Sequence, residues 1–76
     1  MNLTEVPSGR KARIESILDP VTRDYLLRLG IVEGSTVECV QRMARGPVVV
    51  RKSSLELSLG RRVAERILVS SVGDDP

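Results

Sequence analysis

Two glycines on either side of a short apolar link constrain the fold of this chain more than any other feature. Gly30 and Gly34 stand between a segment with helical periodicity and a segment rich in β-branched residues. A helix ends readily at a residue with a left-handed backbone, which glycine adopts without a Cβ penalty. Gly34 then lets the chain turn sharply into Ser35-Thr36-Val37. The sequence therefore predicts a helix that ends at Gly30 and a link that enters a strand at a fixed angle.

The segment before Gly30 predicts a short amphipathic helix that begins at Asp19-Pro20. Asp19 can cap the free N–H groups of the first turn, and Pro20 stands where its missing donor has no cost. One face of about 140° contains all but one of the apolar side chains, namely Val21, Tyr25, Leu26 and Leu29. We expect this face to pack on the rest of the domain. Leu27 lies outside the face, either covered by the following link or exposed for contact.

The remaining segments predict a mainly β chain. The expected strands span residues 10–18, 36–42, 47–51, 55–59 and 66–70. The first strand should bend near Ile17-Leu18, where its alternation breaks. The three valines at 48–50 predict a strand covered on both faces or at a barrel seam. Residues 60–65 are too few for a helix of ordinary length and predict one helical turn before the last strand.

Length and composition limit how these elements can assemble. A chain of 76 residues forms one domain, and without Phe or Trp and with a single Tyr its core must be aliphatic. Five short strands with one inserted helix favour a strongly bent sheet that closes into a small barrel and so removes its exposed edges. We expect the domain to span residues 1–72 and residues 73–76 to form a frayed tail.

The pattern around the two glycines resembles the FeoA family over roughly residues 3–70. The family's Arg, paired leucines, Leu-Gly and second Gly have counterparts in Arg23, Leu26-Leu27, Leu29-Gly30 and Gly34. Further matches are Val37, Val40, Gly46-Pro47-Val48, Leu55, Leu57, Leu59, Ala64, Ile67 and Val69. The chain departs from the family at Glu33, where Pro is usual, and at Gly46-Pro47, between which the family usually has an acidic or amide residue.

The resemblance implies an SH3-like barrel that acts as a small cytoplasmic accessory or regulatory protein of bacterial ferrous iron uptake. Its partner would be the cytoplasmic domain of the FeoB-type GTPase permease, and weak self-association is left open. An alternative is an SH3-like regulatory module similar to the C-terminal domain of metal-dependent repressors. The DNA-binding and dimerisation segments of those repressors have no counterpart in this sequence, which favours the first interpretation.

The residue types argue against catalysis, a cofactor, a small-molecule substrate and a metal site. The chain has no histidine and one cysteine, and its acidic residues up to Glu65 are spread singly. Cys39, in the middle of an expected strand, is interpreted as a small buried hydrophobe. The N-terminus does not resemble a secretory signal and no apolar run approaches the roughly 20 residues of a membrane span, so we expect a cytoplasmic protein without membrane insertion.

Contact surfaces are the remaining source of function. The candidate partner-contact residues are Leu27, Ile31, Met43 and Arg45, and Gly30, Gly34 and Gly46 are expected to shape turns. A basic hairpin with Arg42, Arg45, Arg51 and Lys52 leaves nucleic acid as an alternative partner. That alternative is the weaker one, because single-strand binding depends on stacking aromatics that this chain lacks. The same lack argues against a groove for proline-rich peptides.

Overall fold

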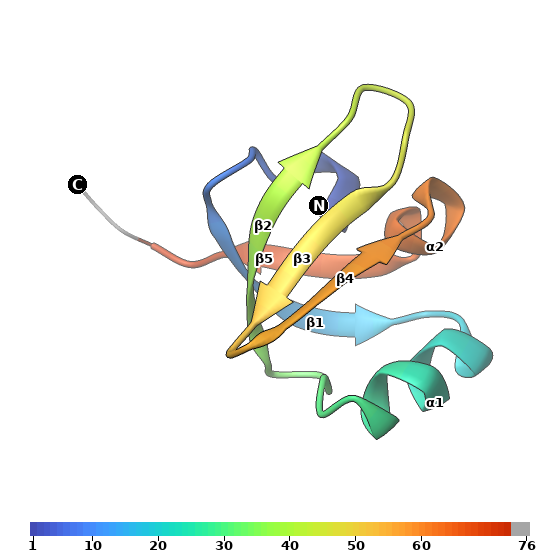
Figure 1. The fold of residues 1–76 in the computed structure, drawn as a ribbon. Helices are drawn as coiled ribbons and strands as arrows, with labels where there is room; N and C mark the ends of the chain where they lie inside the picture. The colour runs from blue at the N-terminus through green and yellow to red at the C-terminus, as the bar shows by residue number, and fades with distance from the viewer. Residues whose placement is uncertain (74–76) are drawn as a thin grey trace.

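The computed structural model describes residues 1–73, apart from the side chain of Arg42, and confirms the mainly β fold (Figure 1). Its elements are a 3₁₀ turn η1 (Leu3–Glu5), β1 (Lys11–Ile17), α1 (Pro20–Arg28), β2 (Thr36–Arg42), β3 (Val48–Lys52), β4 (Leu55–Leu59), α2 (Arg61–Glu65) and β5 (Ile67–Ser71). The expected helical turn before the last strand is the five-residue α2. The last three residues of the expected frayed tail, 74–76, lie outside the described residues.

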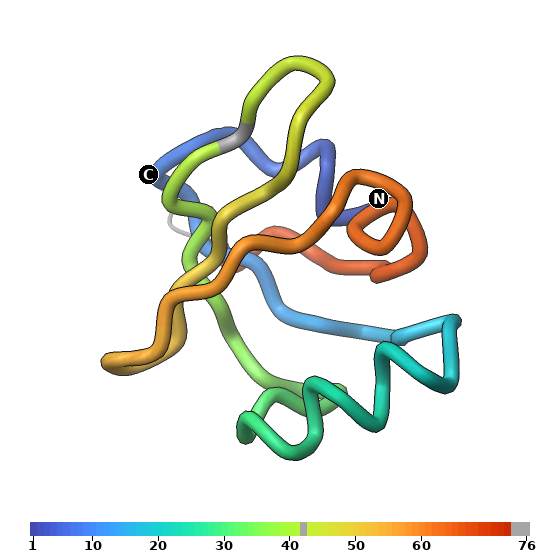
Figure 2. Tube along the Cα trace, turned by 45° about the vertical axis from the view of Figure 1, so that its right-hand side comes forward, coloured from blue at the N-terminus to red at the C-terminus, as the bar shows by residue number. Residues whose placement is uncertain are grey.

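All five strands join one antiparallel sheet in the order β4-β3-β2-β1-β5. The sheet bends strongly, so that its two ends curl toward one another (Figures 1 and 2). Closure is less complete than we expected from the sequence, because β4 and β5 remain the two edge strands. The N-terminal residues cover the outer edge of β5, where the Val69 N–H donates to the Met1 carbonyl at 2.8 Å.

Two register shifts accompany the bend. One lies between Ile14 and Ser16 in the pairing of β1 with β5, and the other between Cys39 and Gln41 in the pairing of β2 with β3. A β-bulge bends its strand and increases the local twist. The irregularity of the first strand is therefore real, although it falls earlier than the Ile17-Leu18 pair at which we expected it.

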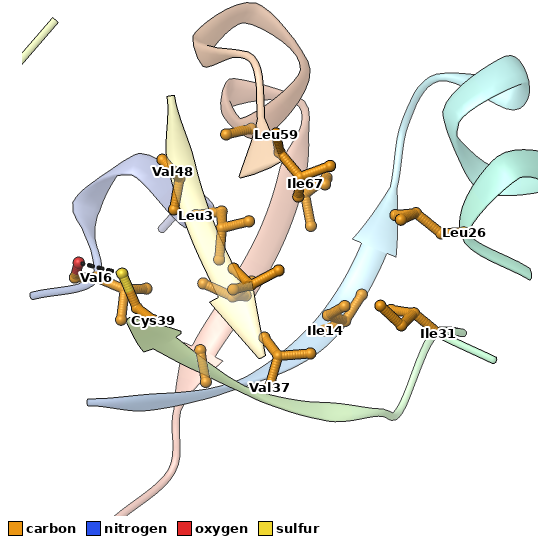
Figure 3. Packing of buried hydrophobic residues seen from close by; sticks show 14 of the residues in the cluster. Leu3, Val6, Ile14, Leu26, Ile31, Val37, Cys39, Val48, Leu59 and Ile67 are labelled. Atoms are coloured by element: carbon orange, nitrogen blue, oxygen red, sulfur yellow. Dashed lines mark hydrogen bonds between the residues drawn. The ribbon is translucent and has the colours of Figure 1, made fainter. Parts of the chain in front are cut away.

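The core is aliphatic, as the composition predicts (Figure 3). Its members are Leu3, Val6, Ala12, Ile14, Ile17, Leu26, Ile31, Val37, Cys39, Val48, Val50, Leu59, Ala64, Ile67 and Val69. Cys39 is buried in the core, and its Sγ lies 3.5 Å from the Val6 carbonyl oxygen, which agrees with its interpretation as a small buried hydrophobe. Val49 is half-buried while its two neighbours are buried, so β3 is only partly covered on its second face.

Both ends of α1 are fixed by the residues that the sequence indicates. The Asp19 carboxylate accepts hydrogen bonds from the Thr22 N–H at 3.0 Å and the Thr22 hydroxyl at 2.7 Å. Gly30 has φ of +83° and its N–H donates to the Leu27 carbonyl, while the Ile31 N–H donates to the Leu26 carbonyl. These two bonds form a Schellman motif. Leu26 and Ile31, the apolar pair of this motif, are both buried in the core beside Ile14 (Figure 3).

The buried face of α1 differs from the predicted one. Thr22 and Leu26 are buried and Leu29 is half-buried, whereas Val21 and Tyr25 are 76% and 54% exposed. At 100° per residue, the observed stripe is rotated by about 40° from the predicted face. In this orientation Leu26 packs in the core with Ile14 and Ile31, and Thr22 is buried while its N–H and hydroxyl donate to the Asp19 carboxylate.

The link after α1 is fixed by side chains as well as by glycine. The Glu33 carboxylate accepts a hydrogen bond from the Ile17 N–H at 3.2 Å and lies 3.5 Å from the Arg23 guanidinium, which donates to the Ile17 carbonyl at 3.0 Å. Gly34, with φ of +97°, donates to the Ile14 carbonyl at 2.7 Å. Glu33 thus anchors the link to the end of β1 at the position where the family usually has a proline.

A candidate docking surface

Helix α1 presents most of its apolar side chains to solvent. Among its nine residues only Thr22 and Leu26 are buried, while Val21, Tyr25 and Leu27 are more than half exposed. The first two lie on one flank of the buried stripe and Leu27 lies on the opposite flank. Large exposed apolar side chains that gather on one element are typical of a contact surface. The helix therefore offers two apolar flanks to a partner.

The first flank borders an open groove of about 330 Å³ between α1, the end of β4 and the start of α2. Val21, Thr22 and Tyr25 line it from α1, and Ser58, Leu59, Gly60 and Val63 line it from the opposite side. None of these side chains is charged. The groove can therefore accept an aliphatic side chain of a partner without leaving a charge unpaired. We call it the α1/β4 groove.

The second flank borders a smaller hollow of about 130 Å³, lined by Arg23, Leu27, Ile31, Val32 and Glu33. Leu27 is 56% exposed, so of its two predicted states the structure has the exposed one. Ile31, in contrast, is 1% exposed and packs in the core, and we withdraw it as an exposed contact residue. Its burial follows from the Schellman motif, which turns the residue after Gly30 inward against Leu26.

The other two predicted contact residues lie far from α1. Met43 and Arg45 occupy the β2–β3 loop and are exposed, and this loop and α1 stand at opposite ends of the domain in both views (Figures 1 and 2). Gly46 shapes the loop because its N–H donates to the Met43 carbonyl and a Cβ on it would lie 3.1 Å from the Met43 Cβ. The four predicted residues therefore do not form one patch.

Two exposed residues of the groove were not predicted from the sequence. Val21 and Tyr25 were assigned to the inner face because they fall within the apolar arc. A sequence signal for the observed face is Thr22, since a hydroxyl residue three positions after the capping Asp19 can donate to the cap and is then satisfied when buried.

The basic hairpin is not a continuous positive surface. Arg51 lies 3.5 Å from Glu38 and 2.9 Å from Glu56, so two carboxylates neutralise its charge. Arg45 lies in the β2–β3 loop, whereas Arg51 and Lys52 lie at the opposite end of β3, next to the turn into β4. The side chain of Arg42, the fourth predicted residue, lies outside the described ones, and the other three give a phosphate backbone no continuous row of cations to follow. The nucleic-acid alternative therefore gains no support from the geometry.

Among residues 1–73, no three His, Cys, Asp or Glu side chains come together as a potential metal site. The prediction that the monomer has no high-affinity iron site stays a prediction. The pKa of Asp19 is lowered, first by the hydrogen bond from the Thr22 hydroxyl and then by that from the Thr22 N–H. This shift belongs to the helix cap and indicates no reactive group. None of the described helices is long and apolar enough to cross a membrane.

Comparisons with known proteins agree with the arrangement of elements. The model of the FeoA domain family matches residues 1–71. The solution structure of the FeoA protein from Chlorobium tepidum is similar with a TM-score of 0.87 and 29% identity, over 100% of this chain and 74% of that one. No curated protein sequence matches the chain.

A second solved structure supplies the description of the fold. FeoA from Stenotrophomonas maltophilia, solved as a complex with zinc, is similar with a TM-score of 0.75 and 29% identity, over 92% of this chain and 89% of that one. That protein is described as a procaryotic SH3 domain protein. The five antiparallel strands, the inserted helix and the short helix before the last strand are thus an SH3-like arrangement.

Proposed function

Because the chain belongs to the FeoA family, we propose that it is an accessory protein of bacterial ferrous iron uptake that binds the cytoplasmic domain of a FeoB-type permease. It would work at the cytoplasmic face of the membrane and exert its effect by contact. The description of the relative from Stenotrophomonas maltophilia supports the pathway, since it links that protein to activation of ferrous iron transport.

The apolar surface of α1 is the observation on which the proposal rests. A domain of 76 residues buries only about 60% of the surface of its unfolded chain, so each large apolar side chain left in water forgoes a contribution to stability that the fold needs. Val21, Tyr25 and Leu27 are nevertheless exposed on one nine-residue helix. A partner that covers them would gain apolar burial that the isolated domain does not obtain.

A contact role also fits the chemistry of the described residues. The sequence has no histidine, and its single thiol is buried beneath the sheet rather than exposed in a cleft. The α1/β4 groove is lined by apolar and hydroxyl side chains and by glycine, and its lining contains no carboxylate, imidazole or thiol. These residues are suited to recognising a surface.

The test is binding of the purified chain to the cytoplasmic domain of the permease, in the presence of GDP and of a non-hydrolysable GTP analogue. Tyr25→Asp and Leu27→Asp each place a charge in the proposed contact and should weaken binding at least tenfold. Both positions are more than half exposed, so the variants should keep their free energy of unfolding within about 1 kcal/mol.

Met43→Asp is the matched comparison, because it makes the same kind of change at an exposed residue at the other end of the domain. If only Met43→Asp weakens binding, the contact lies at the β2–β3 loop and not at α1. If the unaltered chain fails to bind in both nucleotide states, the proposed function is wrong.

A further inference from the structure

The two edges of the sheet differ in how they are covered. At β5, the Met1 carbonyl accepts the Val69 N–H and Asn2 forms a bridge with Leu68. At β4, no such segment from residues 1–73 pairs with the outer edge. An uncovered edge strand presents unpaired main-chain donors and acceptors on which another chain can add a strand.

The register shows which main-chain groups of β4 face outward. Lys52 and Leu55 are paired across the two-residue turn Ser53-Ser54, and antiparallel pairs alternate between hydrogen-bonded and non-bonded. Leu55, Leu57 and Leu59 therefore bond to β3. The N–H and C=O groups of Glu56 and Ser58 point away from it. These groups make the outer edge of β4 a ready template for one more antiparallel or parallel strand.

The α1/β4 groove lies directly beside this edge. Ser58, Leu59 and Gly60 line one side of the groove, and Val21 and Tyr25 line the other. An extended segment that bonds to Ser58 would thus carry its alternate side chains past an apolar hollow. Main-chain pairing combined with a pocket for a side chain is the arrangement by which proteins bind peptides through strand addition.

The charges near the groove indicate the chemistry of such a segment. No acidic residue lines the groove, and β4 is followed by Gly60-Arg61-Arg62. Arg61 lies 3.5 Å from the Glu65 carboxylate, whereas Arg62 is exposed and has no ion pair within residues 1–73. Arg62 directly precedes Val63, which lines the groove, so α2 supplies a cation for an acidic residue that follows or precedes the inserted side chain.

We propose that the outer edge of β4 and the α1/β4 groove together bind an extended peptide segment of a partner protein. The segment adds a strand beside β4, places an aliphatic side chain in the groove and carries an acidic residue next to it. This inference builds on the proposed function, because it states how a partner segment is held at α1.

The experiment is a selection of phage-displayed random nine-residue peptides on the intact chain, followed by calorimetry with the dominant peptide made synthetically. The selected peptides should contain an aliphatic residue beside Asp or Glu. The amides of the peptide are then N-methylated one at a time. Methylation should lower affinity at least tenfold at every second position and should leave affinity unchanged at the positions between them, because only alternate amides bond to a neighbouring strand.

Variants of the chain test the two halves of the site separately. Ser58→Pro removes the outward N–H and should lower affinity for the peptide at least tenfold. Ser58→Ala keeps this N–H and should bind the peptide normally. The proline variant should still fold, because proline is tolerated where the N–H of an edge strand faces solvent. Val21→Asp should also weaken binding, and an acidic residue in the first turn of α1 does not disturb the helix. Met43→Asp, at the other end of the domain, should have no effect on binding of the peptide.

The alternative outcomes refute either this inference or the proposed function. No enrichment of a peptide motif, or equal binding by folded Ser58→Pro, would exclude strand addition at β4. Two results together would assign the edge to a second copy of this chain. Sedimentation would show a dimer, and hydrogen exchange would show that the Glu56 and Ser58 amides are protected before any peptide is added. Peptide binding without permease binding would refute the proposed function alone, and permease binding without protection of these amides would refute this inference alone.

Discussion

The adjacent leucines of α1 allow burial to be measured with the residue type held constant. Leu26 is 1% exposed and packs in the core with Ile14 and Ile31, whereas Leu27 is 56% exposed. Leu→Ala at a buried position costs about 3–5 kcal/mol, and α1, at the periphery of the sheet, should lie near the lower limit. Leu→Ala at an exposed position changes stability by less than about 0.5 kcal/mol. We therefore expect a difference of about 2.5 kcal/mol between Leu26→Ala and Leu27→Ala.

This difference is large for so small a domain. At about 0.05–0.15 kcal/mol per residue, the whole chain should unfold with about 4–11 kcal/mol. Loss of 3 kcal/mol should lower Tm by about 12–24 °C, at about 4–8 °C for each kcal/mol. Urea unfolding followed by far-ultraviolet circular dichroism measures both variants, since the chain has no tryptophan to report on unfolding.

The control is internal, because the two substitutions change helix propensity equally at neighbouring positions of one helix. A difference of less than about 1 kcal/mol between the two variants would refute the assignment of Leu26 as the residue that docks α1. A larger loss at Leu27 than at Leu26 would mean that the helix is rotated from the orientation described above.

Three further predictions concern turns and caps. Gly30→Ala should destabilise the domain by about 1 kcal/mol in urea unfolding. The cause is left-handed backbone strain alone, since an added Cβ would meet no atom within 4 Å. An unchanged midpoint of urea unfolding would contradict the positive φ of Gly30. Ser53→Gly should stabilise the domain by roughly 0.5 kcal/mol, because Ser53 has φ of 56° in the β3–β4 turn; a lower Tm would argue against this turn geometry. The folded-state pKa of Asp19 lies below its unfolded value, so its contribution to stability is complete above about pH 4 and is lost as the pH falls through the lowered pKa. Asp19→Asn, which keeps a capping oxygen, should flatten the dependence of the urea midpoint on pH between 2 and 5, and equal slopes in the two proteins would exclude the cap as a source of acid sensitivity.

The sequence alone determined the elements of this domain, because the signals that define them are local. Asp19-Pro20 begins α1 and Gly30 ends it through bonds that reach no more than five residues along the chain. The aliphatic composition likewise fixed the character of the core, since no aromatic side chain except Tyr25 was available to it.

Tertiary structure decided which surfaces are free. A helix of nine residues with apolar side chains on several sides does not reveal which side will dock, and in the folded domain Leu26 packs in the core beside Ile14 of β1. The separation of Leu27 from Met43 depends on the path of the sheet, and the uncovered edge of β4 depends on where the N-terminus pairs. These features arise from contacts between distant segments, which local periodicity does not encode.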